Sequence, residues 1–484
     1  MIEKALKRYK NLSQEVKASF WFLICGFIQR GISLITTPIF SRLLSTSEYG
    51  DFSVFNTWMS VVTIFATLNL ASGVYVRGLV KYDDDRKKFT GSLESLFLLC
   101  AAICFCVYML FQDFWNGVFD LDSPFVYVMF VDIIVVAAFH FWSAQQRVDV
   151  KYVNLVIFTV INAILRPLAG VIAILLFPDF KLEARIYSMV LVDIVTFDVF
   201  FARIFKNGLK VLTTKYWKYA LAFNLPLVPH YLSQIILNHS DRLMIKSLVG
   251  SSEAGIYSLA YSLASIMVIA NTAVINTLTP WMYKKMKAKA YKDIGNNTLP
   301  ILIFIAFINL TLTAFAPEAI AIFSPSSYHD AIWIVPPVAA STYFIFMYSL
   351  FGNFEFYFDK TRFMLIASVS GAALNIVLNY IFIQIYGYYA AGYTTLVCYL
   401  LYCVGHYILM RRINKNYMDG VKVYNVKALV GISLVFVLLC GLMMVFYTVF
   451  IARLVIYLLL CIIVILNRDK FISIFKEMRA VKKK

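Results

Sequence analysis

The chain has 484 residues, of which 61% are hydrophobic and 15% are charged. A soluble globular protein carries about 25% charged residues, so this composition excludes that class. The net charge is +17, but the basic residues fall between long apolar runs rather than in one patch. Each run is long enough to cross a bilayer at about 20 residues per helix. The sequence therefore predicts an all-α, polytopic membrane protein.

Fourteen apolar segments follow one another along the chain, and each is predicted to be a transmembrane helix. They cover roughly residues 17–38, 52–76, 93–112, 124–145, 152–177, 184–204, 218–246, 255–282, 297–317, 329–353, 363–385, 388–410, 427–447 and 449–466. The segments between them are short, which leaves no room for a soluble catalytic domain. The eight cysteines lie in apolar segments without the spacing of metal ligands. We therefore expect neither a metal nor another cofactor.

Lysine and arginine are distributed very unevenly among the connecting segments. The two termini and every second connection together hold 36 of the 44 basic residues, whereas the remaining connections hold 5. By the positive-inside rule, this asymmetry predicts that both termini face the cytoplasm and that the number of spans is even. The basic residues then act as topology signals, and no nucleic-acid partner is needed to explain the net charge.

A twelve-residue pattern occurs twice at equivalent places in the chain. LLSTSEYGDFSV at Leu43–Val54 returns 205 positions later as LVGSSEAGIYSL at Leu248–Leu259. In each copy a serine, Ser47 or Ser252, is predicted to be a helix N-cap. The glutamate that follows it then lies in the first turn, where the helix dipole favours a carboxylate. The repetition predicts two parallel six-helix repeats, related by an axis along the membrane normal.

The predicted organisation has four parts. Residues 1–205 form an N-terminal lobe of six helices, and residues 206–217 form a cytoplasmic linker. Residues 218–412 form a second six-helix lobe, and residues 413–484 hold two further helices and a basic cytoplasmic tail. In a chain made of two like halves, a pathway between the halves is the leading hypothesis.

Three basic residues, Arg30, Arg166 and Arg242, lie inside predicted spans. An arginine at mid-membrane costs about 2.5–3.5 kcal/mol, so each needs a water-filled cavity or a partner. One interpretation is a cationic cavity between the halves for an anionic headgroup, because a guanidinium can donate two parallel hydrogen bonds to phosphate oxygens. The alternative is a set of internal salt bridges that lock helices together, such as Arg166 with Asp193 or Asp132. Both interpretations stay open at this point.

The seventh predicted span is rich in polar residues and prolines. His230 follows Pro226 and Pro229, and prolines free backbone carbonyls that need other partners, as happens beside a cavity. We therefore expect His230 to face the cavity. Asp241 precedes Arg242 directly, and adjacent helical residues point about 100° apart. These two side chains need not pair with each other.

Three runs carry a family resemblance: GFIQRGISLITTPIFSRLLSTSEYGDFSVF (Gly26–Phe55), SDRLMIKSLVGSSEAGIYSLAYSL (Ser240–Leu263) and LNIVLNYIFI (Leu374–Ile383). With them the chain resembles the Wzx-type polysaccharide-biosynthesis or O-antigen flippases of the MOP superfamily. That superfamily includes the MATE drug exporters and the lipid II flippases. The resemblance covers nearly the whole chain and implies two six-helix lobes around a central cavity.

The resemblance also implies which residues contact substrate. Cationic residues of such a cavity are thought to engage the pyrophosphate of an undecaprenyl-linked oligosaccharide. Arg30 matches the basic position of the family's first span, and Asp241 with Arg242 matches its polar pair in the seventh span. Arg166 is assigned from its predicted burial alone, and His230 from the neighbouring prolines.

The implied function is a flippase for a lipid-linked repeat unit of O-antigen, capsule, exopolysaccharide or lipopolysaccharide. It would work by alternating access, without covalent chemistry, so the protein is not expected to be an enzyme. An inside-negative potential would assist outward movement of an anion by about 2.3 kcal/mol per charge per 100 mV. Coupling to a proton or Na⁺ stays open, with Asp132 and Asp193 as candidates. The expected location is the bacterial inner membrane, and the expected partners are the lipid bilayer, the lipid-linked glycan and other membrane proteins of glycan assembly.

Two alternatives remain. A MATE-like, cation-coupled drug exporter would need an acidic ion site, and the first span contains no aspartate. A membrane glycan polymerase or transferase would usually carry a sizeable outer loop with catalytic residues, and the predicted outer loops are short. Both are therefore less favoured than a flippase.

Overall fold

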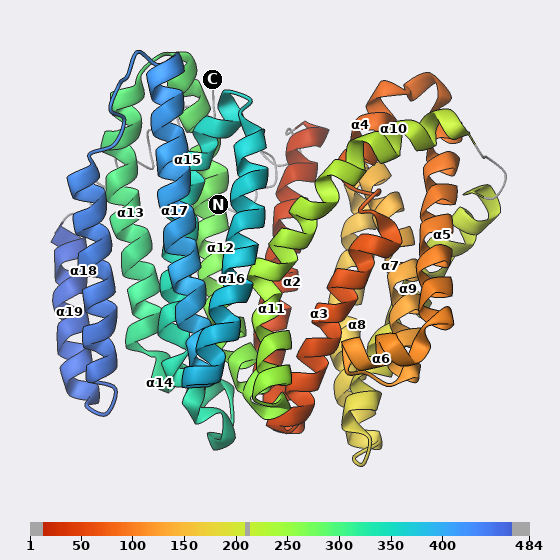
Figure 1. Cartoon of the computed structure of the whole chain (residues 1–484), viewed down its shortest axis with the longest axis horizontal. Coiled ribbons are helices and arrows are strands. Elements are labelled where there is room, and N and C mark those ends of the chain that lie inside the picture. Colours follow the sequence, from red (N-terminus) through yellow and green to blue (C-terminus); the bar gives the residue numbers. More distant parts are fainter. Residues whose placement is uncertain (1–12, 209–212, 467–484) are drawn as a thin grey trace, which may run out of the picture. The chain divides into compact units, whose positions relative to one another are not determined.

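The computed structural model describes residues 13–208 and 213–466. All regular structure in these residues is helical, which confirms the all-α prediction. Part of the predicted linker 206–217, the first basic residues and the basic tail lie outside the described residues. The chain divides into two compact units, Met1–Ile235 and Ile236–Lys484, and the boundary falls within one helix, α11. Each unit is a bundle of helices (Figure 1).

The N-terminal unit is a bundle of long helices joined by short ones. Its elements are α2 (Gln14–Leu43), α3 (Thr46–Thr67), α4 (Gly73–Lys81), the 3₁₀ turn η1 (Asp83–Asp85), α5 (Arg86–Leu110), α6 (Gln112–Phe119), α7 (Ser123–Val148), α8 (Tyr152–Leu176), α9 (Lys181–Gly208), α10 (Thr214–Asn224), the 3₁₀ turn η2 (Leu225–Leu227) and the start of α11 (Val228–Leu248). Helix α9 packs on α7 and α8, α2 packs on α8, and α3 packs on α5. Aromatic rings fill much of the core, and Phe139 stacks on Phe197 with ring centroids 4.2 Å apart.

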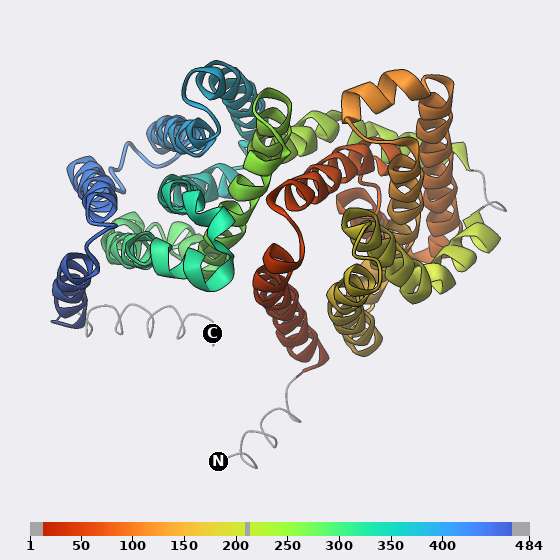
Figure 2. The same cartoon turned by 90° about the horizontal axis from the view of Figure 1, so that it is seen from below.

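The C-terminal unit is built around two central helices, α15 and α17. Its elements are the end of α11, α12 (Ser251–Lys287), α13 (Tyr291–Ala314), α14 (Ala316–Phe323), the 3₁₀ helix η3 (Ser326–Trp333), α15 (Val335–Tyr357), α16 (Thr361–Tyr386), α17 (Tyr389–Tyr417), α18 (Val426–Val445) and α19 (Phe450–Leu466). Helix α15 packs against α17, α12 and α13, while α16 packs on α17. Helices α18 and α19 both pack on α13, and Figure 2 shows the helices of this unit nearly end-on.

Eleven helices among the described residues are long and apolar enough to cross a membrane. They account for eleven of the fourteen predicted spans, and α10 and α11 together make one of them. The remaining three predicted spans correspond to α3, α9 and α19. The chain is thus a multi-pass membrane protein, while the count of fourteen and the arrangement in repeats stay predictions.

The first copy of the repeated pattern begins helix α3 with a capping box. Glu48 N–H donates to Ser45 Oγ at 3.2 Å, and Ser45 N–H donates to the Glu48 carboxylate at 2.7 Å. The prediction of Ser47 as the N-cap is therefore wrong by two residues, because the box needs its glutamate three residues after the cap. The cap predicted for the second copy is late by the same amount, since Gly250 precedes α12. The glutamate expected in the first turn is confirmed in both copies.

The predicted span 52–76 is interrupted in its second half. Helix α3 ends at Thr67, and the next two residues, Leu68 and Asn69, have positive φ values of 46° and 51°. Such values are uncommon outside glycine and persist only where neighbours hold them. Here Asn224 Nδ2 donates to the Leu68 carbonyl at 2.7 Å, and Asn69 N–H donates to Thr67 Oγ1 at 3.0 Å. The break lets α4 pack beside α7.

The predicted span 218–246 is also built from pieces. Helix α10 ends at Asn224, the 3₁₀ turn η2 contains Pro226, and α11 begins at Val228 with Pro229 in its first turn. Because proline lacks an N–H and clashes with the preceding turn, it stops a regular helix. The predicted single span is thus divided, at these two prolines, into α10, the turn η2 and α11.

One buried arginine anchors the two C-terminal helices. Arg453 is 3% exposed and donates to both carboxylate oxygens of Glu318, at 2.9 and 2.7 Å. It also donates to three carbonyl oxygens, those of Ala314 at 2.5 Å, Phe446 at 3.0 Å and Tyr447 at 3.3 Å. A buried charge is stable only when it is paired and hydrogen-bonded. All donors of this guanidinium are therefore used to fix α19 to the α13–α14 corner.

Candidate functional site: a cationic cavity in the N-terminal unit

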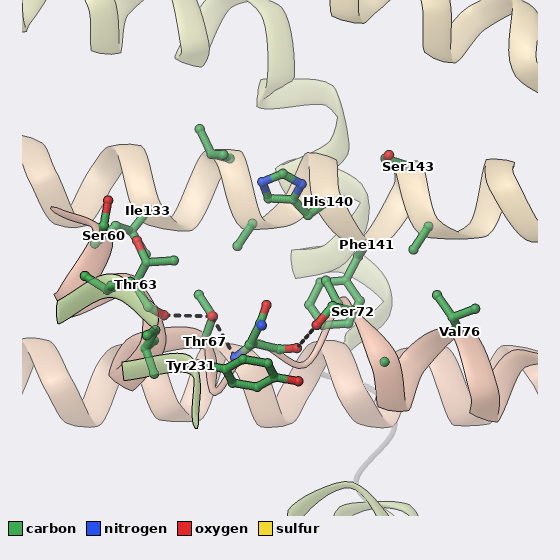
Figure 3. Close-up of a pocket in the computed structure, with 18 of the residues that line it drawn as sticks. Ser60, Thr63, Thr67, Ser72, Val76, Ile133, His140, Phe141, Ser143 and Tyr231 are labelled. Atoms are coloured by element: carbon green, nitrogen blue, oxygen red, sulfur yellow. Dashed lines mark hydrogen bonds between the residues drawn. The ribbon is translucent and has the colours of Figure 1, made fainter. Parts of the chain in front are cut away.

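A cavity of about 1040 Å³ lies within the N-terminal unit. Its walls come from α3, the turn after α3, α4, α7, Arg166 of α8 and the start of α11. Figure 3 shows side chains of α7 across from side chains of α3 and α4: Ile133, His140 and Ser143 face Thr67, Ser72 and Val76. Ligand pockets usually measure about 300–1,000 Å³. This cavity therefore has room for a ligand larger than a single sugar.

Three hydroxyl side chains of α3 line the cavity: Ser60, Thr63 and Thr67. Each donates its proton to the carbonyl oxygen four residues earlier in the helix, at 2.8, 2.6 and 2.7 Å respectively. A hydroxyl has one donor and two acceptor positions. What these side chains offer a ligand is therefore acceptor oxygens. We call Ser60, Thr63 and Thr67 the hydroxyl face.

Two further arginines line the cavity, Arg77 of α4 and Arg147 in the last turn of α7, and both are exposed. No carboxylate in residues 13–208 and 213–466 forms an ion pair with either one. The guanidinium carbon of Arg77 lies 5.6 Å from the Phe223 ring centroid, and that of Arg147 lies 5.8 Å from the Phe22 centroid. A contact with an aromatic face orients a guanidinium without using its N–H donors. The donors of both arginines therefore stay available to a ligand.

Arg166 reaches the cavity from α8 but is already paired. Its Nη2 lies 2.9 Å from Oδ2 of Asp193, whose side chain is fully buried. Asn162 Nδ2 donates to the other oxygen of Asp193 at 2.6 Å. Of the two interpretations that the sequence left open for Arg166, the structure therefore shows the salt bridge. It also leaves 31% of the Arg166 side chain exposed.

A second carboxyl group stands beside this ion pair. Asp132 of α7 lines the cavity, is 3% exposed and lies against the carboxyl group of Asp193. Within the described part of the chain, its Oδ1 has no hydrogen-bond partner. Two carboxyl groups thus lie together near the cavity wall, and among the described ion pairs Arg166 is bound to that of Asp193.

Arg30 lies on α2 and is exposed. It is not among the residues that line the cavity of the N-terminal unit, and none of the described carboxylates forms an ion pair with it. Its predicted place in a cavity between the two halves stays a prediction. His230 is half-buried at the start of α11, next to Tyr231, which does line the cavity of the N-terminal unit.

In the C-terminal unit, Asp241 of α11 is fully buried in a hydrogen-bond network. It accepts from Tyr257 Oη and Asn379 Nδ2 at 2.5 Å each, and from Thr395 Oγ1 at 3.0 Å. Asn379 also donates to Asn375 Oδ1 at 3.2 Å. Side chains of α11, α12, α16 and α17 are joined in this way, as polar residues often join helices in membranes.

Arg242 has a different set of partners from its neighbour Asp241. Arg242 is 7% exposed. Its Nη1 donates to the Asn238 carbonyl at 3.2 Å and lies 2.7 Å from Nδ1 of His239. Its guanidinium carbon lies 4.6 Å from the centroid of the Tyr261 ring. The two adjacent residues therefore point to separate surroundings, as the helical spacing predicts.

One buried ionisable pair in the C-terminal unit was not identified from the sequence. His406 Nδ1 lies 2.6 Å from Oε1 of Glu355, and the two side chains are 0% and 1% exposed. The ring of Tyr348 stacks on the imidazole with centroids 5.3 Å apart. Glu355 lies in the last turn of α15 and His406 within α17, so no sequence pattern connects them.

Candidate metal ligands are sparse in the described helices. No group of three or more His, Cys, Asp and Glu side chains there is placed to hold a metal ion. The oxygens around Asp241 belong to a single carboxylate, to amides and to hydroxyls, and they are engaged with N–H and O–H donors. The expected absence of a metal and of another cofactor stays a prediction.

Known proteins resemble this chain in sequence. The family described as "Polysaccharide biosynthesis protein" matches residues 16–286. The probable low-salt glycan biosynthesis flippase Agl15 of Haloferax volcanii is 20% identical over 402 residues, which are 81% of this chain and 82% of that protein.

Known structures resemble it in fold. The lipid II flippase MurJ, in an inward closed conformation, has a TM-score of 0.70 at 15% identity and covers 92% of this chain and 98% of its own. An inward-facing multidrug resistance transporter of the MATE family, from the MOP superfamily, has a TM-score of 0.61 at 13% identity. It covers 80% of this chain and 96% of its own. At such low identity the likeness concerns the fold, whereas the family match spans more than half of the chain and confirms the resemblance stated from the sequence. The chain belongs to the polysaccharide biosynthesis protein family and has the fold of the MOP-superfamily transporters.

Proposed function

We propose that this protein is a flippase for an undecaprenyl-pyrophosphate-linked oligosaccharide. Its cargo would be the repeat unit of a surface polysaccharide such as O-antigen, capsule or exopolysaccharide. Its path would lead from the cytoplasmic to the outer leaflet of a bacterial inner membrane. The family match and the flippase named among its relatives support transport rather than covalent chemistry. The observation that carries the proposal is a cavity of about 1040 Å³ with three arginines in its wall.

The proposed mechanism is alternating access, in which a site open to one side of the membrane closes and then opens to the other. The phosphates pair with arginine side chains, because a guanidinium fork matches phosphate oxygens. The sugars occupy the water-filled cavity, and the polyprenyl tail stays in lipid. Arg30 and Arg166 are proposed substrate contacts, since both are accessible within a membrane-spanning helix.

The other predicted site residues receive supporting roles in this proposal. His230 lies next to a residue of the cavity wall and is a proposed direct contact. Asp241 is fully buried and Arg242 is 7% exposed, so their proposed contribution is to hold the polar middle of α11 in place. Alanine substitution of Asp241 should therefore disturb folding before it disturbs substrate recognition.

We also propose that Asp132 and Asp193 form the ion-coupling site and that the ion is a proton. With one guanidinium for two carboxylates, one negative charge is unbalanced, and a proton on the pair neutralises it. Exchange of this proton would alter how firmly Asp193 holds Arg166. Asp132→Asn should abolish the pH dependence of flipping in proteoliposomes, whereas Asp198→Asn, on the exposed side of the same helix as Asp193, should preserve it. An unchanged pH profile in Asp132→Asn would contradict the coupling role.

The central test is complementation of a strain that lacks this protein. Arg30→Ala should abolish export of the surface glycan while the variant stays in the membrane, and Arg30→Lys should restore part of it because the charge survives. Arg42→Ala, a change of an exposed arginine near the end of the same helix, is the matched control and should export normally. Full export by Arg30→Ala would remove Arg30 from the mechanism. Export in the strain without any copy of the protein would remove the proposed function.

The proposed orientation in the membrane has its own test. A single cysteine in the turn Ser45–Ser47, placed in a cysteine-free variant, should react with a membrane-impermeant reagent added outside cells. A cysteine at Lys287 should not react, because the basic end of α12 is predicted to face the cytoplasm. Outside labelling at Lys287 would reverse the proposed direction of the chain.

The alternative is a cation-coupled drug exporter with a MATE-like fold. Such a protein would bind cationic compounds, whereas the cavity wall carries three arginines and one aspartate. Resistance of cells to cationic drugs, with normal surface glycan in the deletion strain, would favour this alternative. A glycan polymerase or transferase is the less favoured alternative, and it would leave the lipid-linked repeat unit on the outer leaflet when deleted.

A further inference from the structure

The arginines of the cavity differ in how much of their bonding capacity is free. Arg166 is held by the buried carboxylate of Asp193 at 2.9 Å, so a phosphate would have to displace a fixed negative charge. Arg77 and Arg147 have no carboxylate partner among the described residues and rest on the rings of Phe223 and Phe22. The most available anion-binding donors of this cavity are therefore those of Arg77 and Arg147.

Arg77 and Arg147 lie toward the same end of the cavity. Figure 3 shows Val76 and Ser143 at one end, while Ser60 and Ile133 lie at the other. Arg77 follows Val76 directly, and Arg147 lies one helical turn beyond Ser143 on α7. Both arginines belong to segments that the distribution of basic residues predicts to be cytoplasmic. We call this pair the arginine end of the cavity.

The acidic residue nearest to this end in sequence does not neutralise it. Asp149, two residues after Arg147, accepts from Arg86 at 2.6 Å and lies 3.8 Å from Lys151 Nζ. His140 lies two helical turns before Arg147 on α7 and also lines the cavity. Neither Arg77 nor Arg147 forms an ion pair with a carboxylate of the described residues, which favours an anionic ligand at the arginine end.

The hydroxyl face has the opposite preference. The protons of Ser60, Thr63 and Thr67 are all donated to carbonyls of their own helix, so the face presents acceptor oxygens. Phosphate oxygens are acceptors too and gain nothing from such a face unless the helix gives up its hydroxyl bonds. Sugar hydroxyls and the amides of acetamido sugars can donate to it. The hydroxyl face therefore selects the glycan and rejects the phosphates.

We infer that the cavity holds its substrate in one orientation, with the pyrophosphate at Arg77 and Arg147 and the first sugars along Ser60, Thr63 and Thr67. This inference rests on the proposed function and assigns two residues, Arg77 and Arg147, that the sequence marked only as topology signals. The phosphates bind at the end predicted to be cytoplasmic, where the substrate enters. The glycan extends toward the end of the cavity at Ile133, and the neighbouring Asp132 also lines the cavity.

The test uses the purified full-length protein in nanodiscs of zwitterionic lipid, with undecaprenyl pyrophosphate without sugar as the probe. The double variant Arg77→Gln/Arg147→Gln should bind this probe at least tenfold more weakly than the wild type. Arg77→Lys/Arg147→Lys should fall between the two, because the charge remains and the fork is lost. Arg411→Gln/Arg412→Gln, which removes two exposed arginines of α17 outside the cavity, is the matched control and should bind like the wild type.

A second variant tests the hydroxyl face. Ser60→Ala/Thr63→Val should bind the sugar-free probe with unchanged affinity and should bind the glycosylated lipid at least threefold more weakly. Thermal unfolding of each variant separates a loss of binding from a loss of folding. An equal loss for both lipids in Ser60→Ala/Thr63→Val would contradict a glycan contact at this face.

The outcomes separate this inference from the proposed function. If the wild type binds undecaprenyl pyrophosphate and Arg77→Gln/Arg147→Gln binds it equally well, the phosphates lie elsewhere and the orientation is wrong. If phosphatidylglycerol competes as well as inorganic pyrophosphate does, Arg77 and Arg147 form a site for anionic membrane lipid, which also overturns the inference. If the wild type fails to bind both the sugar-free and the glycosylated lipid, the proposed function falls and the inference falls with it.

Discussion

The N–H donors of arginines are used differently in two regions of this protein. In the C-terminal unit, every N–H donor of Arg453 forms a hydrogen bond to a protein atom, either of one carboxylate or of three carbonyls. In the N-terminal unit, Arg77 and Arg147 form no ion pair with a described carboxylate, and their guanidinium groups contact aromatic rings beside a cavity. A guanidinium of the first kind stabilises the fold, while one of the second kind keeps N–H donors available at the cavity wall.

Two further arginines fall between these extremes. Arg185 is 8% exposed, and its guanidinium carbon lies 3.8 Å from the Phe40 ring centroid and 4.8 Å from that of Phe52. It also donates to the carbonyl oxygen of Arg166 at 3.3 Å. Arg166 is paired with Asp193 yet remains 31% exposed at the cavity wall. The arginines of this protein thus differ in how many of their N–H donors other protein atoms already use.

The largest effect on stability is expected at Arg453. Arg453→Met should lower the free energy of unfolding by about 3 kcal/mol, because it leaves three carbonyls and the Glu318 carboxylate without their donor. The measurement is thermal unfolding in detergent. Arg77→Met is the comparison and should leave the unfolding midpoint nearly unchanged. Equal losses in the two variants would erase the distinction between fastening and ligand-binding arginines.

The Arg166–Asp193 pair should show an intermediate effect. Arg166→Gln leaves the fully buried Asp193 carboxylate without its cation and should cost about 2 kcal/mol, less than the about 3–5 kcal/mol of a fully buried pair because Arg166 is partly exposed. The double variant Arg166→Gln/Asp193→Asn should recover a large part of that loss, since both charges are gone. A double-mutant cycle in thermal unfolding measures the coupling, expected at about 1 kcal/mol or more. Strictly additive losses would mean that the pair contributes nothing as a pair.

The ion pair of Glu318 with Arg453 should make stability depend on pH. The hydrogen bond from Arg453 lowers the pKa of the Glu318 carboxyl below its ordinary value. A carboxyl with a lowered folded-state pKa stabilises the protein above its unfolded pKa, and this stabilisation is lost as the pH falls through the folded-state pKa. Near neutral pH the wild type should therefore be more stable than Glu318→Gln by about 1 kcal/mol, a modest value because the carboxylate is partly exposed. The difference should shrink as the pH falls below about 4.3, and a difference that grows instead would contradict the ion pair.

The sequence predicted the helical class and the approximate place of most spans, because long apolar runs and alternating basic connections are strong signals. It could not predict the break at Leu68 and Asn69, since asparagine tolerates a left-handed turn but a single one in an apolar run does not predict it. That break is held by Asn224, which lies 156 residues away. Long-range contacts of this kind leave no local trace in the sequence.

The candidate site was predicted only in part for a related reason. The sequence singled out arginines inside predicted spans, which found Arg166 at the cavity wall. It assigned Arg77 and Arg147 to connections, because they stand at the edges of apolar runs next to other basic residues. The structure places both in the wall of the same cavity. A charge count by segment cannot distinguish a topology signal from a ligand-binding side chain at the mouth of a cavity.

The smallest effect is expected from the aromatic ring beneath Arg77. The guanidinium carbon of Arg77 lies 5.6 Å from the Phe223 ring centroid, and a cation–π contact at an exposed site contributes about 0.5–1 kcal/mol. Phe223→Leu should therefore weaken binding of undecaprenyl pyrophosphate by about two- to fivefold, because Arg77 loses the surface that holds its fork in place. Phe22→Leu should act in the same way through Arg147. Phe450→Leu, which alters a ring near the fastened Arg453, is the matched control, and its binding should equal that of the wild type because a guanidinium held by Glu318 and three carbonyls needs no aromatic support. Equal weakening in all three variants would show that the rings act on the fold as a whole and do not position particular arginines for a ligand.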